Sequence, residues 1–201
     1  MAAYPNISGY PTKYPFTEYL DLPSDEELGT DLANFCHEEA QNLKDGRMML
    51  AAGLVGTNMI NLAKSVFRIP GVDPKIREFI VLRIAKHVGG VNPWGPNLRM
   101  LKNLGATEAE VKGLLSDGPV TGMDEEASLI MQACDEITLQ GAIQDPTMKR
   151  MKEKYDRDTI CKYVLTLSWY NMFNRYVVST RVPLESEEEI EEKIGRSTRP
   201  A

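Results

Sequence analysis

Glu78 is the residue whose type and surroundings best suit acid/base chemistry. On helical spacing its side chain shares a face with mostly apolar residues, and these neighbours are Pro74, Lys75, Val81, Leu82 and Ala85. An apolar environment penalises the charged form of a carboxyl group, which suits the group to exchange protons near neutral pH. The alternative is a structural carboxylate paired with an arginine, for which Arg77 and Arg99 are the candidates.

His87 is one of two histidines in the chain. It follows Glu78 by nine residues, so the two side chains project from opposite sides of an ideal helix at about 100° per residue. They therefore cannot pair within that helix. We expect His87 to be a surface residue near a helix C-terminus, which favours the positive form of the ring. The alternative is a catalytic residue that faces the pocket of another subunit.

The apolar segment from 158 to 183 contains a polar stripe. Ser168, Asn171 and Arg175 fall at i, i+3 and i+7, and Asn174 is adjacent. Polar groups on such a helix need partners from another helix, a subunit interface or a ligand. A guanidinium can clamp a carboxylate or phenolate oxygen, so Arg175, Asn171 and the neighbouring Tyr170 are candidate substrate-binding residues. A hydrogen-bond network between subunits is the alternative interpretation.

Capping patterns and apolar periodicity place these residues in an all-α chain of about seven or eight helices. Ser24 and Thr107 each precede a glutamate at the capping-box position, and Asp73-Pro74 marks a further helix start. No segment follows the period-two pattern of a strand over more than a few residues. The expected helices begin at Ser24 and then span about 47–68, 74–88, 94–104, 107–115, 123–143, 145–155 and 158–183.

The two ends of the chain differ in composition from the rest. Residues 1–23 hold four prolines and four tyrosines without a helical period, and we expect an extended arm. Residues 24–184 form a single helical domain, and residues 185–201 form an acidic tail. Within the tail, residues 185–193 carry six glutamates and one lysine, which is −5 of the total charge of −6. We expect this acidic stretch to be solvated.

Composition excludes several classes of function. The 201 residues are 42% hydrophobic and 26% charged, which is typical of a soluble globular protein. We expect its partner to be a small-molecule substrate. There is no basic surplus to bind nucleic acid, and no apolar run of the ~18–20 residues that a membrane span needs. The first residues do not form a signal peptide, and Cys36, Cys134 and Cys161 lack disulfide or metal-site spacing. We expect a cytoplasmic protein without a metal or cofactor.

Residues 77–106 resemble the carboxymuconolactone decarboxylase family, within the wider alkylhydroperoxidase-D-like superfamily. The segment reads REFIVLRIAKHVGGVNPWGPNLRMLKNLGA. It follows the family order of a helix that begins R-E, a glycine turn, a W-x-x-H segment and an amphipathic helix that ends at glycine. The likeness covers about residues 58–184 and includes the later segments TEAEV, EEA, CDE and WYNMFNR. The resemblance implies an all-helical homo-oligomer, a trimer or hexamer, with pockets near the subunit contacts.

Two departures from the family pattern bear on the chemistry. Gly90 and Pro93 stand where peroxidase members carry the Cys-x-x-Cys pair, so thiol-dependent peroxide reduction is not expected. Asn97 stands where decarboxylase members carry a histidine, and an amide cannot accept a proton near pH 7 as imidazole does. Asn97 could instead donate N–H to a developing enolate, or be an ordinary first-turn residue. Trp94 could line an aromatic pocket or belong to the core.

Together these residues predict a cofactor-free acid/base enzyme. Glu78, His87 and Asn97 are its candidate catalytic residues, and Trp94, together with the polar residues of the 158–183 helix, would bind substrate. The reaction would be a decarboxylation, an isomerisation or a cyclisation of a small enolisable aromatic, polyketide-like or lactone substrate in biosynthetic tailoring. The alternative is a catalytically silent helical oligomer with a ligand-binding or scaffolding role.

Overall fold

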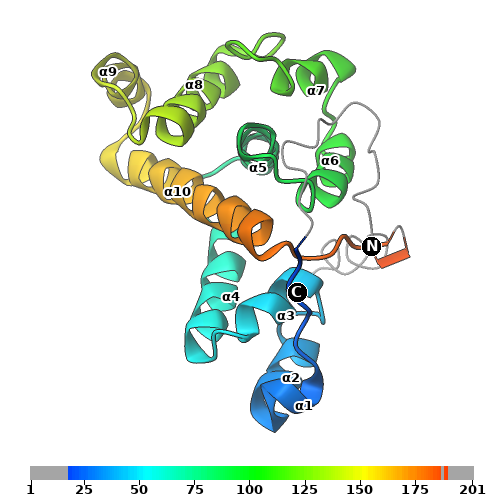
Figure 1. Ribbon diagram of the computed structural model, residues 1–201. Helices are drawn as coiled ribbons and strands as arrows, with labels where there is room; N and C mark the ends of the chain where they lie inside the picture. The colour runs from blue at the N-terminus through cyan, green and yellow to red at the C-terminus, as the bar shows by residue number, and fades with distance from the viewer. Residues whose placement is uncertain (1–17, 187, 190–201) are drawn as a thin grey trace.

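The computed structural model describes residues 18–186, 188 and 189, and this part of the chain contains helices and no strand (Figure 1). The all-α class is confirmed. Ten helices are present in this part, because two of the expected helices are each divided at a glycine turn. The helices are α1 (Asp25–Leu28), α2 (Thr30–Glu38), α3 (Lys44–Leu50), α4 (Leu54–Phe67), α5 (Pro74–Val88), α6 (Trp94–Asn103), α7 (Glu108–Leu114), α8 (Glu125–Gln140), α9 (Asp145–Lys154) and α10 (Arg157–Thr180).

Helix α5 lies at the centre of the molecule. It contacts α6, α7, α8 and α10, and these helices lie around it in Figure 1. As predicted, Asp73 caps its start: the carboxylate accepts hydrogen bonds from the backbone N–H groups of Lys75 and Ile76 at 2.7 and 3.1 Å. Gly89 ends it in the left-handed region at φ 75°. Every side chain from 76 to 85 is buried.

The burial of α5 on all sides has a consequence for its charged residues. Arg77, Glu78 and Arg83 are buried among the apolar side chains of this helix. A charge removed from water must be paired and hydrogen-bonded, because its burial otherwise costs several kcal/mol per ion. The partners of these three residues therefore decide how neighbouring elements pack against α5.

The predicted helix over 47–68 is wrong, because the chain folds back within it. Helix α3 ends at Leu50, Gly53 adopts φ 61°, and α4 begins at Leu54. The two helices pack closely, since a Cβ on Gly56 would lie 2.0 Å from the backbone oxygen of Met49. The small residues of this segment are the contact surface of a helical hairpin and not the interior of one helix.

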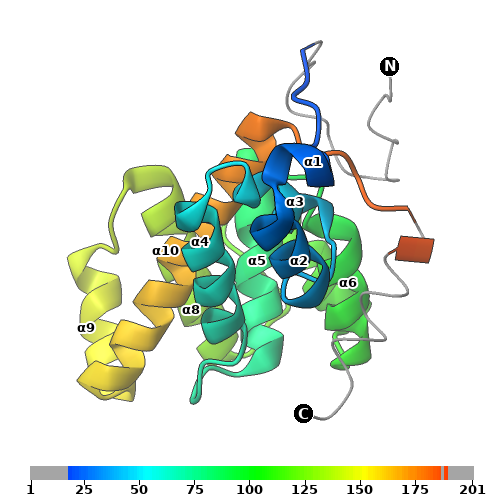
Figure 2. The ribbon, with the colours of Figure 1, turned by 90° about the horizontal axis from the view of Figure 1, so that it is seen from below.

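Helices α1–α4 form a second layer of the structure. They lie below α10 in Figure 1 and in front of α5 in Figure 2. Helix α4 contacts α10, and the Tyr176 hydroxyl of α10 donates to the backbone oxygen of Met48 at 2.8 Å. Phe173 packs against the buried clusters of both layers. The long last helix thus joins the two layers.

Local capping signals predicted most of the remaining boundaries. Ser24 and Thr107 form complete capping boxes at α1 and α7. The predicted start of the last helix at Asp158 is wrong by two residues, because the Asp156 side chain accepts from the backbone N–H of Thr159 at 2.8 Å. Both aspartates are followed by helix formers, and only the geometry of the loop decides which one caps.

Glu185, the first residue of the acidic tail, is half-buried, contrary to expectation, whereas Ser186, Glu188 and Glu189 are exposed as expected. Glu185 accepts a hydrogen bond from the backbone N–H of Lys44 at 3.1 Å, and the Lys44 ammonium group lies 2.7 Å from Glu189. Upstream, the Asn92 amide donates to the backbone oxygens of Val182 and Pro183. The chain after α10 therefore lies against the starts of α3 and α6. The other residues of the tail, and residues 1–17 of the expected arm, lie outside the described residues.

In residues 18–186, 188 and 189, no helix combines the length and apolar character needed to cross a membrane.

The close contact between α3 and α4 predicts the effect of a single methyl group. Gly56→Ala should lower the free energy of unfolding by about 3 kcal/mol, because the added Cβ meets backbone that no side-chain rotation can move. Gly118→Ala is the matched control: nothing lies within 4 Å of its Cβ position, and we expect a change within about 0.5 kcal/mol. Urea unfolding midpoints measure both, and equal midpoints would contradict the packing described for α3 and α4.

Candidate functional site

Glu78 forms an ion pair with the residue before it. Its side chain is fully buried, and the Nε and Nη2 atoms of Arg77 both donate to its Oε1, at 3.1 and 2.9 Å. The third guanidinium nitrogen of Arg77 donates to the backbone oxygen of Phe67, and the guanidinium carbon lies 4.0 Å from the centre of the Phe67 ring. Of the two arginines considered as partners in the sequence, the structure thus pairs Arg77 with Glu78.

This pair is difficult to explain by stability alone. A buried ion pair recovers little more than the cost of removing its charges from water, and well-packed apolar residues often replace such pairs without loss. The surrounding side chains of α5, such as Phe79 and Ile80, are apolar and fully buried. A charged pair at such a position is a candidate functional site, because burial and a fixed partner are how proteins tune proton-transfer groups.

Tyr170 from α10 lies on the same side of α5 as Glu78. Burial, and next the negative charge of Glu78, raise the pKa of Tyr170 well above its ordinary value, and the charge of Arg77 opposes this. The phenol therefore stays protonated at neutral pH and acts as an O–H donor. Glu78, Arg77 and Tyr170 together place an acceptor of protons beside two donors of hydrogen bonds. We name these three residues the α5–α10 group.

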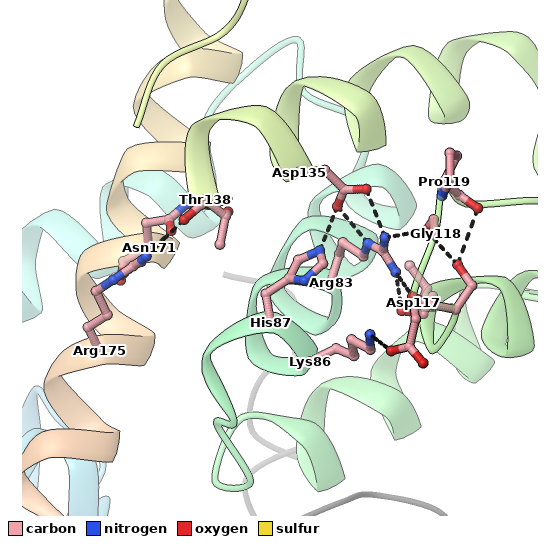
Figure 3. Close-up of polar contacts among 12 residues, drawn as sticks. Arg83, Lys86, His87, Asp117, Gly118, Pro119, Asp135, Thr138, Asn171 and Arg175 are labelled. Carbon is pink, nitrogen blue, oxygen red and sulfur yellow. Dashed lines mark hydrogen bonds and ion pairs between the residues drawn. The ribbon is translucent and has the colours of Figure 1, made fainter. Parts of the chain in front are cut away.

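A second polar group lies between α5 and α8 (Figure 3). Arg83 is buried, and its Nε and Nη2 atoms donate to the two carboxylate oxygens of Asp135 at 2.6 and 2.8 Å. The same guanidinium donates to the backbone oxygens of Leu114, Ser116 and Gly118. Arg83 therefore fastens the loop after α7 to α5 and α8.

His87 belongs to this second group, and its expected surface position is wrong. Its Nε2 atom lies 2.7 Å from Asp135 Oδ1, and the side chain is only 8% exposed, because α8 lies over this end of α5. Burial raises the pKa of Asp135, but hydrogen bonds from Arg83 and His87 outweigh it and leave the pKa below its ordinary value. His87 and Glu78 therefore have different partners, from α8 and from α5 itself.

The polar stripe of α10 has partners within the chain. Asn171 Nδ2 donates to Thr138 Oγ1 at 3.0 Å, and Arg175 donates to the backbone oxygen of Thr138 at 3.1 Å and to Asn171. These contacts join α10 to the end of α8, as Figure 3 shows. The stripe therefore does not require a second subunit for its hydrogen bonds. Ser168 lies on the exposed side of the helix.

Asn97 and Trp94 lie at the start of α6. The Asn97 amide donates to the backbone oxygen of Pro93 at 2.6 Å, so one of its two N–H groups serves its own helix turn. Trp94 is buried in the main core. Their assignment as a donor to substrate and as a pocket wall stays a prediction.

Gly90 shows why a cysteine does not fit at this position. A Cβ on Gly90 would lie 2.6 Å from Asn174 Oδ1, which is closer than side-chain carbon and amide oxygen atoms approach. Cys36 and Cys134 are buried, and Cys161 is exposed on α10. Burial raises the pKa of the Cys134 thiol far above its ordinary value, so this thiol is not a ready nucleophile.

Sequence reasoning missed Arg83 and Asp135 as partners. The signal was present in part: Arg83 and His87 are four residues apart on one helix, so their side chains share a face. A single carboxylate from another helix can therefore meet both. The identity of that carboxylate follows only from the packing of α8.

No group of three or more histidine, cysteine, aspartate or glutamate side chains that could hold a metal ion occurs within the described residues.

Comparison with solved structures identifies the fold. A protein of unknown function from Agrobacterium tumefaciens, described as a candidate AhpD antioxidant-defence protein, is 18% identical with a TM-score of 0.56, over 65% of this chain and 90% of that chain. An uncharacterised peroxidase-related protein from Silicibacter sp. TM1040 is 12% identical with a TM-score of 0.67, over 84% and 92% of the two chains. No family model and no curated protein matches the sequence.

The chain therefore has an AhpD-like fold, and the resemblance found in the sequence is confirmed at the level of fold. At these identities the likeness says nothing of the reaction, because one fold supports many functions.

The second polar group predicts a pH-dependent loss of stability. Asp135→Asn should lower the free energy of unfolding by about 3 kcal/mol at pH 7, because it leaves buried Arg83 without its counter-charge. The folded-state pKa of Asp135 is below the ordinary 3.8, so its contribution is complete above that pH and is lost as pH falls through the lower folded value. The free energies of unfolding of wild type and Asp135→Asn should therefore converge in that pH range.

Urea unfolding at a series of pH values measures this difference. Asp117→Asn is the matched control, because Asp117 pairs with Lys86 but its side chain is fully exposed, and we expect no measurable change. A difference between wild type and Asp135→Asn that stays constant down to pH 2 would contradict the assignment.

Proposed function

We propose that this protein is a cofactor-free acid/base enzyme that acts on a small enolisable substrate, with Glu78 as its base. The observation that carries the proposal is a fully buried carboxylate on the central helix, held at one oxygen by Arg77 and beside the protonated phenol of Tyr170. Such a combination is what proton abstraction next to a carbonyl requires.

The reaction begins with the transfer of a proton from carbon to Glu78. The neighbouring guanidinium of Arg77 stabilises the carboxylate form, which is the form that accepts a proton. The electron pair of the broken C–H bond moves into the carbonyl and gives an enolate. In a low-dielectric site, hydrogen-bond donors aimed at the enolate oxygen stabilise it more than they would in water.

Tyr170 is the donor we assign to that oxygen. Its phenol stays protonated because burial and the charge of Glu78 oppose its ionisation. Asn97 and Arg175 are further candidates for binding a carboxylate or enolate, and Asn171 and Trp94 for shaping the site. His87 is a further candidate catalytic residue on the other side of α5, where it pairs with Asp135.

Three reactions share this intermediate. Protonation of the enolate at a different atom is an isomerisation, its attack on an internal electrophile is a cyclisation, and loss of CO₂ from a β-keto acid produces it directly. We propose an aromatic, polyketide-like or lactone substrate of biosynthetic tailoring in the cytoplasm, where the three unpaired cysteines would remain reduced. Peroxide reduction is not proposed, since the chain has no Cys-x-x-Cys pair.

The alternative is a catalytically silent helical oligomer that binds a ligand or a partner protein. The observation that favours it is the same Arg77–Glu78 pair, which a purely structural role would also satisfy. The two readings differ in whether a small molecule exchanges a proton with Glu78.

Deuterium exchange separates these readings. We expect the wild-type protein in D₂O to catalyse exchange into members of a panel of phenolic carboxylic acids, enolisable cyclohexadienones and unsaturated lactones. Glu78→Gln should reduce the rate at least ~100-fold, because general-base catalysis contributes about 10²–10⁴-fold. Proton NMR of the substrate measures the rate.

Two further variants keep this measurement interpretable. Glu78→Asp retains the charge that Arg77 needs, so it should fold and still lose rate because its carboxylate is shorter. Glu136→Gln is the matched control, since Glu136 on α8 is also buried but accepts hydrogen bonds from the Thr147 hydroxyl of α9 and the backbone N–H of Gln144, and it should exchange at the wild-type rate. Exchange that persists in both Glu78 variants would refute Glu78 as the base, and no exchange in wild type would favour the silent oligomer.

We also propose that the protein assembles as a homo-oligomer, a trimer or hexamer, through the outer face of α10. Leu165 and Met172 are exposed on this face, at 45% and 41%, and Ser168 lies between them. Exposed large apolar side chains on one helix face are typical of subunit contacts.

Sedimentation tests the assembly. The wild type should sediment as a trimer or hexamer, and Leu165→Glu combined with Met172→Glu should yield monomers, because two buried charges oppose the contact. Leu104→Glu, just after the end of α6, is the control, since Leu104 is exposed to a similar degree, 42%, and should leave the assembly intact. A monomeric wild type would disprove the oligomer.

A further inference from the structure

Asn174 carries a buried hydrogen-bond acceptor that nothing in the described part of the chain satisfies. The side chain lies on the inner face of α10 and is fully buried. Its Nδ2 atom donates to the backbone oxygen of Tyr170 at 2.9 Å. Its Oδ1 atom has no hydrogen-bond partner, and a buried polar atom left in this state costs about 1–3 kcal/mol.

This oxygen packs closely against the backbone at Gly90. A Cβ added to Gly90 would lie 2.6 Å from Oδ1 of Asn174 and 3.5 Å from the Cα of Ala85. Gly90 does not have a positive φ, so its backbone conformation does not require glycine. What requires glycine at this position is the amide oxygen of Asn174 itself.

Asn174 lies in the same contact between α5 and α10 as Glu78, Arg77 and Tyr170, the α5–α10 group. Tyr170 precedes it by one helical turn, so both side chains point from α10 towards α5. Glu78 and Ala85 are seven residues apart on one face of α5, which corresponds to about 10 Å of helix. The unsatisfied Oδ1 of Asn174 therefore lies near one end of the contact between α5 and α10, and the carboxylate of Glu78 lies nearer the other end.

We propose that Asn174 Oδ1 binds a hydroxyl or amide N–H group of the substrate and so selects substrates that carry such a donor within about 10 Å of the enolisable carbon. This inference rests on the proposed function. A carbonyl or ether oxygen at that position would face another acceptor and is rejected. A phenol or alcohol donates to Oδ1 and removes the cost of the unsatisfied amide, so the free energy of that hydrogen bond favours hydroxylated compounds.

Matched ligand pairs test this selection. We would measure the dissociation constants of 4-hydroxyphenylpyruvate, a hydroxylated unsaturated lactone and the methyl ether of each by isothermal titration calorimetry. In the wild type the methyl ethers should bind roughly tenfold to a hundredfold more weakly than the hydroxyl compounds. Equal binding within both pairs, or no binding of any of the four, overturns the proposal.

Two variants locate the selection at Asn174. Asn174→Leu removes the acceptor with little change of volume, and Gly90→Ala places a methyl group against it; each should bring the members of a pair to within about threefold of one another. Asn174→Leu should unfold at the same or a higher urea concentration than wild type, because no orphan atom remains. A lower midpoint with unchanged ligand preference overturns the proposal in favour of a structural amide.

A control variant and the exchange measurement separate this proposal from the proposed function. Thr166→Val on α10 removes a buried hydroxyl that bonds only to its own helix, at Lys162, and should keep the wild-type preference. Selection of hydroxyl compounds without deuterium exchange supports the role of Asn174 and refutes Glu78 as a base. Deuterium exchange without selection of hydroxyl compounds supports Glu78 as a base and refutes the role of Asn174.

Discussion

The burial of α5 on every side is the constraint on which the rest of the structure depends. A helix that has no solvent-facing side cannot leave a charged residue to water, so each one fixes a neighbour. Arg83 fixes the loop after α7 and the carboxylate of Asp135 on α8. Arg77 fixes the end of α4 through the backbone oxygen of Phe67. The arrangement of the bundle around α5 depends on these hydrogen bonds and ion pairs as much as on apolar packing.

The two charged pairs of α5 differ in what they accomplish. The Arg83–Asp135 pair joins three segments and gains backbone hydrogen bonds in return for its burial, which is a sufficient structural reason for it. The Arg77–Glu78 pair joins adjacent residues of one helix, and Arg77 also donates to the backbone oxygen of Phe67 at the end of α4. The base role that we propose for Glu78 gives a chemical reason for this costly burial, and the same proposal assigns the unsatisfied oxygen of Asn174, which also faces α5, to the substrate.

Much of the fold could be predicted because its signals are local. Asp73, Gly89 and Thr107 act on backbone groups within one turn, so sequence alone determined those helix ends. The hairpin of α3 and α4 could not be predicted, since Gly56 reads as a helical residue until Met49 is found against it. Of the candidate site, the partner of Glu78 was among the two arginines considered. The burial of His87 and the pairing of Arg175 depend on where α8 lies, which no spacing within one helix reveals.

The contact of Glu185 with Lys44 has a consequence for the order of folding during synthesis. The two residues are 141 positions apart, and Tyr176 meets Met48 across 128 positions. Helix α3 is synthesised long before Tyr176 and Glu185. Helices α1–α4 therefore cannot complete their contacts until α10 and the residues after it have been made. Closing such long loops before their contacts form slows folding. A nascent chain stalled before residue 176 would hold α5 and α8 but have an unfinished surface around α3, the part that chaperones would have to protect.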